Sequence, residues 1–127
     1  FEPGDHATTF GGQPLATSAA RAVLAEMRRL DIPAVATKAG ERLRAGLLDL
    51  PAVTEVRGLG LLLAAELDTD ELGRDAKAIA AELLDRGLIV NPVTASALRL
   101  APPLTVTDAE IDEAVATIAD VLDGSVE

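Results

Sequence analysis

The sequence contains no cysteine, tryptophan or tyrosine, and its only aromatic side chains are Phe1 and Phe10. The absence of cysteine excludes a disulfide framework and thiolate metal sites. His6 is the only histidine, which excludes a histidine-rich metal site, so we expect no bound metal. Because aromatic residues are nearly absent, the core must be built from aliphatic side chains.

Positive charge is also scarce. Eleven lysines and arginines stand against 21 aspartates and glutamates, which gives a net charge of −10. This excess of negative charge disfavours binding to nucleic acid or to an anionic membrane. The longest apolar run, around residues 59–65, is far shorter than the roughly 20 residues that span a bilayer. We therefore expect neither a nucleic-acid nor a membrane partner.

The start of the chain resembles the middle of a loop. Residues 1–5, FEPGD, contain no initiating methionine, and no secretory pattern follows them. We expect the chain to be the carboxy-terminal part of a longer protein. The alternative is a natural domain whose amino terminus has been processed. Its 127 residues suffice for one hydrophobic core.

The most informative stretch is residues 6–14, HATTFGGQP, which precedes an alanine-rich amphipathic segment. Adjacent glycines let backbone N–H groups approach an anion, and the two threonines add hydroxyl donors. Pro14 suits the first position of a helix, whose amino end favours negative charge. The stretch predicts an oxyanion, in particular phosphate, near residues 8–12. A turn that merely caps a helix is the alternative.

Hydrophobic periodicity predicts an α+β fold, a small layered domain with helices packed on one face of a mostly antiparallel sheet. We expect helices over residues 14–30, about 33–50, 76–84 and 111–122. Strands are expected at 53–57 and 61–67, joined by a tight turn, and at 88–90 and 97–100 around a turn at Asn91-Pro92, with a charged loop over 68–75.

Individual residues refine these elements. Val35, Ala39, Leu43, Leu47 and Leu50 are expected to form the inner stripe of the second helix. Gly87 is expected to end the third helix in a left-handed conformation, and Thr107 with Glu110 fits a capping box before the last one.

Three ordered segments resemble one family. Residues 4–16, GDHATTFGGQPLA, resemble the Gly-x-His-x-Ser/Thr-Thr-Phe/Tyr-Gly-Gly-Asn-Pro-Leu-Ala segment of class III pyridoxal-phosphate aminotransferases, and acetylornithine aminotransferases most of all. The segments VRGLGL at 56–61 and LRLAPPL at 98–104 agree with the family in order and spacing, so the resemblance runs from residue 1 to about 122. Gln13 departs from the usual asparagine, which tolerates left-handed conformations more readily.

The resemblance implies the carboxy-terminal small domain of a fold type I enzyme. Residues 1–14 would be a phosphate-contacting loop on the large-domain side, residues 15–32 a long connecting helix, and residues 33–127 the small domain. The partners implied are an amino-terminal large domain that this chain lacks and a second subunit of a cytoplasmic homodimer.

The implied reaction moves an amino group from N-acetylornithine to 2-oxoglutarate through pyridoxal 5'-phosphate, in arginine biosynthesis. In the family the lysine that forms the Schiff base lies upstream of these segments, so we expect no catalytic residue here and no activity of this chain alone. Lys38 and Lys77, the only lysines, are expected on the polar sides of helices. The alternatives are a sister enzyme acting on ornithine, 4-aminobutyrate or succinylornithine, and a noncatalytic phosphate-binding or dimerisation module.

The resemblance also implies residue roles. Thr9 matches the threonine whose hydroxyl reaches the cofactor phosphate of the partner subunit, and Thr8 matches a position that touches substrate. Arg99 lies in an apolar strand, where a buried guanidinium would need an anionic partner. In relatives such an arginine pairs with a large-domain glutamate or with the carboxylate of the dicarboxylic substrate; a structural ion pair at a domain interface is the alternative. Arg57 and His6 are expected to be structural.

Overall fold

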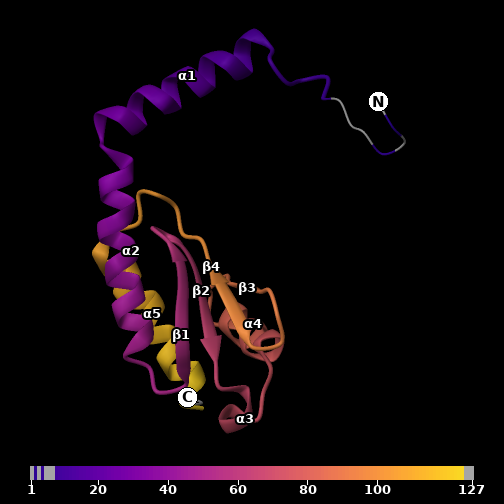
Figure 1. Ribbon diagram of the computed structural model, residues 1–127, viewed down its shortest axis with the longest axis vertical. Coiled ribbons are helices and arrows are strands. Elements are labelled where there is room, and N and C mark those ends of the chain that lie inside the picture. The colour runs from indigo at the N-terminus through magenta and orange to yellow at the C-terminus, as the bar shows by residue number, and fades with distance from the viewer. Residues whose placement is uncertain (1, 3, 5–7, 125–127) are drawn as a thin grey trace. The chain divides into compact units, whose positions relative to one another are not determined.

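The computed structural model describes residues 2, 4 and 8–124. The chain divides into two compact units, Phe1–Ile32 and Pro33–Glu127. Figure 1 shows the first as a loop followed by helix α1, Pro14–Arg29, and the second as a sheet with its helices.

Helix α1 begins where the sequence predicts. Pro14 occupies its first turn, and Arg28 and Arg29 lie in its last turn, where positive charge is favourable. No residue of α1 is buried, and the apolar side chains of Val23 and Leu24 are more than half exposed. The helix is followed by Asp31, which has a positive φ of 48°.

In its described residues, the second unit contains four helices and four strands. They are α2 (Ile32–Leu48, which begins at the last residue of the first unit), β1 (Val53–Leu59), β2 (Leu62–Leu67), α3 (Thr69–Leu72), α4 (Ala76–Asp85), β3 (Asn91–Pro92), β4 (Ala97–Leu100) and α5 (Asp108–Leu122). Within the described residues, no helix has the length and apolar character needed to cross a membrane.

The strands form one antiparallel sheet in the order β1-β2-β4-β3. Leu63 and Ala65 of β2 lie opposite Leu100 and Leu98 of β4, and all four are buried. Helices α2, α4 and α5 share the aliphatic core with these inward-facing residues (Figure 1). The expected fold class, helices on one face of an antiparallel sheet, is confirmed.

The expected stripe of the second helix is only partly correct. Ala39, Leu43 and Leu47 are buried in the core, and Leu50 packs against it. Val35, however, is 40% exposed, although Ile32 in the same turn of α2 is buried.

The expected caps are confirmed. Thr107 Oγ1 accepts a hydrogen bond from the Glu110 backbone N–H, while the Glu110 carboxylate accepts one from the Thr107 backbone N–H. Gly87 has a φ of 87° and follows the C-cap residue of α4, Arg86.

Two predicted elements are wrong. Residues 68–75 contain the short helix α3, because the Asp68 carboxylate accepts a hydrogen bond from the Glu71 backbone N–H and caps a turn. The strand expected at 88–90 lies instead at Asn91–Pro92, which pair with Arg99 and Leu98. The Leu88 N–H donates to the Leu83 carbonyl, which ties that segment to the end of α4. Pro92 is tolerated because β3 is an edge strand.

Candidate functional site

The loop before α1 presents two free hydroxyl groups. Thr8 and Thr9 are exposed, and neither side chain has a hydrogen-bond partner in the part of the chain that is described. The Gln13 side-chain Nε2 donates to the Thr9 carbonyl at 3.2 Å, which closes the loop onto the start of the helix. Gln13 itself has an extended backbone with φ −64°, so this position does not need the left-handed tolerance of asparagine.

The glycines shape this loop. A Cβ atom at Gly11 would lie 2.4 Å from Thr8 Cγ2, so a side chain there would displace Thr8. Gly12 has a φ of 76°, a conformation that favours glycine. No side chain caps α1, and its first turn holds no acidic residue. Two free hydroxyls beside an uncapped helix amino end fit a bound phosphate. His6 lies outside the described residues.

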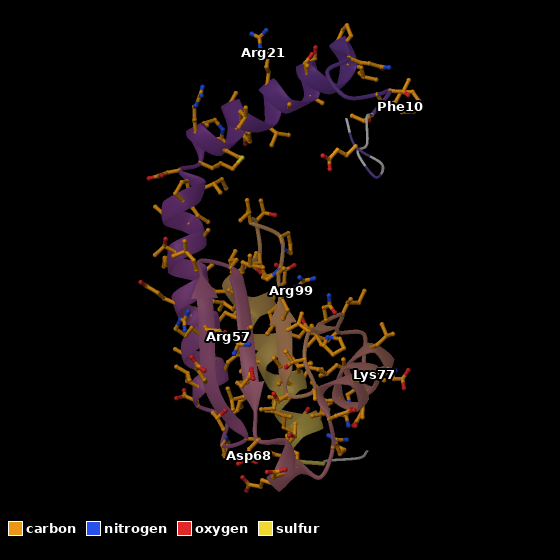
Figure 2. All side chains as sticks on the ribbon, turned by 45° about the vertical axis from the view of Figure 1, so that its right-hand side comes forward. Phe10, Arg21, Arg57, Asp68, Lys77 and Arg99 are labelled. Carbon is orange, nitrogen blue, oxygen red and sulfur yellow. The ribbon has the colours of Figure 1, made fainter. Side chains whose placement is uncertain are left out.

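A second group of polar residues lies on the face of the sheet opposite the core. Arg57 of β1 and Arg99 of β4 both lie opposite Ala64 of β2, one on each side of it. Figure 2 shows both arginines over the sheet. Arg57 Nη1 lies 2.7 Å from Glu66 Oε2, and the Ser96 hydroxyl donates to Glu66 Oε1 at 3.0 Å. Thr8 and Thr9 belong to the first unit, and the arginines to the second.

The environment of Glu66 keeps its carboxylate charged. The hydrogen bond from Arg57 has the largest effect and lowers the pKa of Glu66; burial opposes it, and the bond from Ser96 lowers the pKa further. The Arg57–Glu66–Ser96 group was missed by sequence reasoning. Counting outward from the predicted turn at Gly60 places residues 57 and 66 on adjacent strands, which is the signal that could have found it.

Arg99 differs from the expectation. Its neighbours Leu98 and Leu100 are buried while Arg99 is exposed, because successive side chains of a strand point to opposite faces. The premise of a buried guanidinium is therefore wrong for this chain. Among the described residues, Arg99 has no hydrogen-bond or ion-pair partner. In the described part of the chain its guanidinium thus has no partner, whereas the Glu66 carboxylate is engaged by Arg57 and Ser96.

The remaining expectations concern lysine and apolar surface. Lys38 and Lys77 are exposed, as expected for the polar sides of their helices.

The tip of the β1–β2 hairpin exposes Leu59 to 87% and Leu62 to 61%. These two side chains border an apolar hollow whose other lining includes Pro33, Ala36, Leu61, Pro102 and Leu104.

Comparison with known proteins places this arrangement in one family. The family model described as Aminotransferase class-III matches residues 1–122. An acetylornithine aminotransferase of Caldanaerobacter subterraneus subsp. tengcongensis is 44% identical over 126 residues, which cover 96% of this chain and 31% of that protein. An ornithine aminotransferase of Bordetella pertussis is 43% identical over 123 residues, which cover 96% of this chain and 29% of the relative.

Solved structures of aminotransferases also match this chain. An N-acetylornithine aminotransferase of Stenotrophomonas maltophilia matches with a TM-score of 0.80 at 31% identity over 90% of this chain and 32% of that one. An ornithine aminotransferase of Toxoplasma gondii matches with a TM-score of 0.77 at 31% identity, covering 98% of this chain and 30% of that one. The chain thus spans about 30% of the length of these curated relatives. It belongs to the class III aminotransferases.

Proposed function

We propose that this chain is the carboxy-terminal part of a pyridoxal-phosphate-dependent enzyme that moves an amino group from N-acetylornithine to 2-oxoglutarate. The observation that carries the proposal is the exposed guanidinium of Arg99, which has no partner among the described residues of this class III aminotransferase chain. An acceptor with two carboxylates needs such a group, because a planar guanidinium can donate two parallel hydrogen bonds to one carboxylate.

Ornithine is the second candidate amino donor. The Bordetella pertussis ornithine aminotransferase is 43% identical to this chain, against 44% for the acetylornithine relative, and this difference is too small to separate them. We favour N-acetylornithine because the segments at 4–16 and 98–104 resemble that subgroup most.

The Thr8–Gly12 loop is the proposed contact with the cofactor phosphate. When bound, pyridoxal phosphate supplies the electron sink for amino transfer. The Thr9 hydroxyl would donate to the phosphate of the cofactor held in the partner subunit, and Thr8 would contact substrate. Gly11 leaves room for Thr8, and the uncapped amino end of α1 favours the negative charge.

Replacing Thr9 with valine tests this contact, because valine keeps the shape of threonine and removes the hydroxyl. We expect the full-length enzyme to bind pyridoxal phosphate about 1.5–3 kcal/mol more weakly, the scale of one hydrogen bond to a charged group. The affinity is measured by titrating the cofactor-free enzyme and following absorbance. Thr9→Ser keeps the hydroxyl and should bind normally. An unchanged affinity in the valine variant would remove Thr9 from the phosphate site.

The covalent step needs residues that this chain does not supply. Both of its lysines are exposed, and neither lies in a buried pocket of the kind that holds a Schiff-base lysine. The chain alone is therefore proposed to be inactive. Activity is proposed to require a large domain, since the matched relatives are about three times as long as this chain.

A second subunit is the other proposed partner. The exposed leucines at the hairpin tip and the exposed apolar residues of α1 are surface that a monomer of this chain leaves in water. We expect the full-length enzyme to sediment as a dimer at the concentrations used for assays. A fully active monomer would contradict the partner's role, since the phosphate contact is proposed to cross between subunits.

A further inference from the structure

The hollow at the tip of the β1–β2 hairpin is formed by three segments that are far apart in the sequence. Its lining comes from residues 33–37 of α2, residues 59–62 of the hairpin and residues 101–104 after β4. Among the described residues, none that lines it is charged. The Thr37 hydroxyl donates to the Pro33 carbonyl at 2.9 Å, so it is satisfied within α2. In a chain with a net charge of −10, the hollow is therefore an uncharged, apolar surface.

Helix α2 fixes the backbone of the hairpin tip. Gly60 lies so close to this helix that a Cβ atom at Gly40 would be 2.1 Å from the Gly60 carbonyl oxygen. Arg44 of α2 also donates to the carbonyls of Val56 and Gly58, which attaches the end of β1 to the same helix. The tip is thus held in position without burial of its two exposed leucines.

These leucines lie mostly in water, although the backbone that carries them is fixed. Leu59 is 87% exposed and Leu62 is 61% exposed, and Leu104, which also lines the hollow, is 41% exposed. Exposed apolar side chains around a preformed hollow are typical of a surface that contacts another part of a protein or a partner. The hollow therefore has the properties of a docking surface.

The size of the hollow favours an occupant from the same polypeptide over a second subunit. Ten of the described residues line it, whereas a stable interface between separate proteins uses about 20–30 residues on each side. A segment of the same polypeptide can dock on a smaller surface, because the covalent connection gives it a high effective concentration. The relatives have the necessary length, since the region matched by this chain is only 31% of the acetylornithine aminotransferase of Caldanaerobacter.

We propose that an apolar segment from the amino-terminal part of the full-length enzyme docks in this hollow, against Leu59 and Leu62. This inference rests on the proposal that the chain is the carboxy-terminal part of a longer enzyme. It assigns the hairpin tip to a contact within one polypeptide. The exposed apolar residues of α1, which include Leu15, Val23 and Leu24, are then the surface that remains for the second subunit.

Site-specific photocrosslinking in the full-length enzyme identifies the occupant. Leu59 is replaced by the photoreactive amino acid p-benzoylphenylalanine, the enzyme is irradiated, and the cross-linked peptides are mapped by mass spectrometry. We expect a product with the mass of one polypeptide, in which residue 59 is joined to a residue that precedes Phe1. The matched control carries the same probe in place of Lys77, which is exposed on α4 and does not line the hollow (Figure 2). The control should form little of this product.

The other outcomes overturn the inference. A product of doubled mass would show that a second subunit covers the hollow. Cross-links confined to the 127 residues of this chain, or a yield no higher than that of the control, would show that no amino-terminal segment docks there. Glutamate formation by the unmodified enzyme tests the proposed function separately, so an inactive enzyme with the expected cross-link would refute the function and leave the inference standing.

A smaller substitution serves if the bulky probe prevents folding. Leu62→Cys introduces a thiol into a chain that has no cysteine, and Lys77→Cys is its control. In the folded full-length enzyme, we expect the thiol at residue 62 to react with a maleimide at least about tenfold more slowly than the thiol at residue 77, because a covered thiol is inaccessible. Mass spectrometry of the two labelled peptides measures both rates. Equal rates would overturn the inference.

Discussion

Replacing Arg99 with glutamine is expected to lower the specificity constant kcat/KM of the acceptor half-reaction, with 2-oxoglutarate as substrate, by roughly 100-fold, while the half-reaction with the amino donor stays within about threefold. Two charge-assisted hydrogen bonds to one carboxylate are lost, and about 3 kcal/mol of lost transition-state binding corresponds to a change of that size. Single-turnover absorbance measurements on the full-length enzyme, with each substrate separately, distinguish the two half-reactions.

Arg99→Lys is the informative companion. It keeps the charge but not the planar fork, so we expect a loss intermediate between the original enzyme and Arg99→Gln. Equal losses in both half-reactions, together with a lower free energy of unfolding, would contradict the substrate role and indicate a structural ion pair with another domain.

Replacing Gly40 with alanine is expected to destabilise the protein by about 2 kcal/mol or more, although alanine is the better helix former. A Cβ atom at Gly40 would lie 2.1 Å from the Gly60 carbonyl oxygen and 3.0 Å from Gly60 Cα. These are backbone atoms at the hairpin turn, and Arg44 of α2 also holds β1 by donating to the carbonyls of Val56 and Gly58. The overpacking cost of about 1–3 kcal/mol, or more against backbone, exceeds the roughly 1 kcal/mol gained in helix propensity.

Gly46 in the same helix provides the control. A Cβ atom there would meet the Val115 side chain at 3.0 and 3.2 Å, and a side chain can shift more easily than a backbone turn. We expect Gly46→Ala to stay within about 1 kcal/mol of the original protein, since the contact cost and the helix gain nearly cancel. Urea unfolding of both variants measures the difference. Equal stabilities would contradict the close approach of α2 to the hairpin.

Local sequence patterns predicted most of the helices and strands. The capping box at Thr107 and the glycine after α4 predict their helix ends because each depends on hydrogen bonds or φ values within a few residues. The misplaced strand arose where distant contacts decide the structure, whereas the missed helix α3 depends on a local cap at Asp68. Pro92 lies in a strand because the edge of the sheet tolerates its missing N–H, which no local pattern reveals.

The residues of the candidate site also differ in how well the sequence predicts them. The Thr8–Gly12 loop could be recognised from adjacent residues, because hydroxyls, glycines and a helix start follow one another in the chain. The relation of Arg57, Glu66 and Ser96 depends on pairing across three strands and could not be read from composition. The exposure of Arg99 followed from strand alternation, which its leucine neighbours obscured. The roles of these residues in substrate and cofactor binding stay predictions.

The most direct measurement is amino transfer by the full-length enzyme, with N-acetylornithine or ornithine as donor, 2-oxoglutarate as acceptor, and glutamate as the product followed. We expect glutamate formation that requires pyridoxal phosphate, with N-acetylornithine the better donor, and no glutamate from the 127-residue chain alone. A folded, cofactor-loaded enzyme that forms no glutamate from either donor would contradict the proposed function.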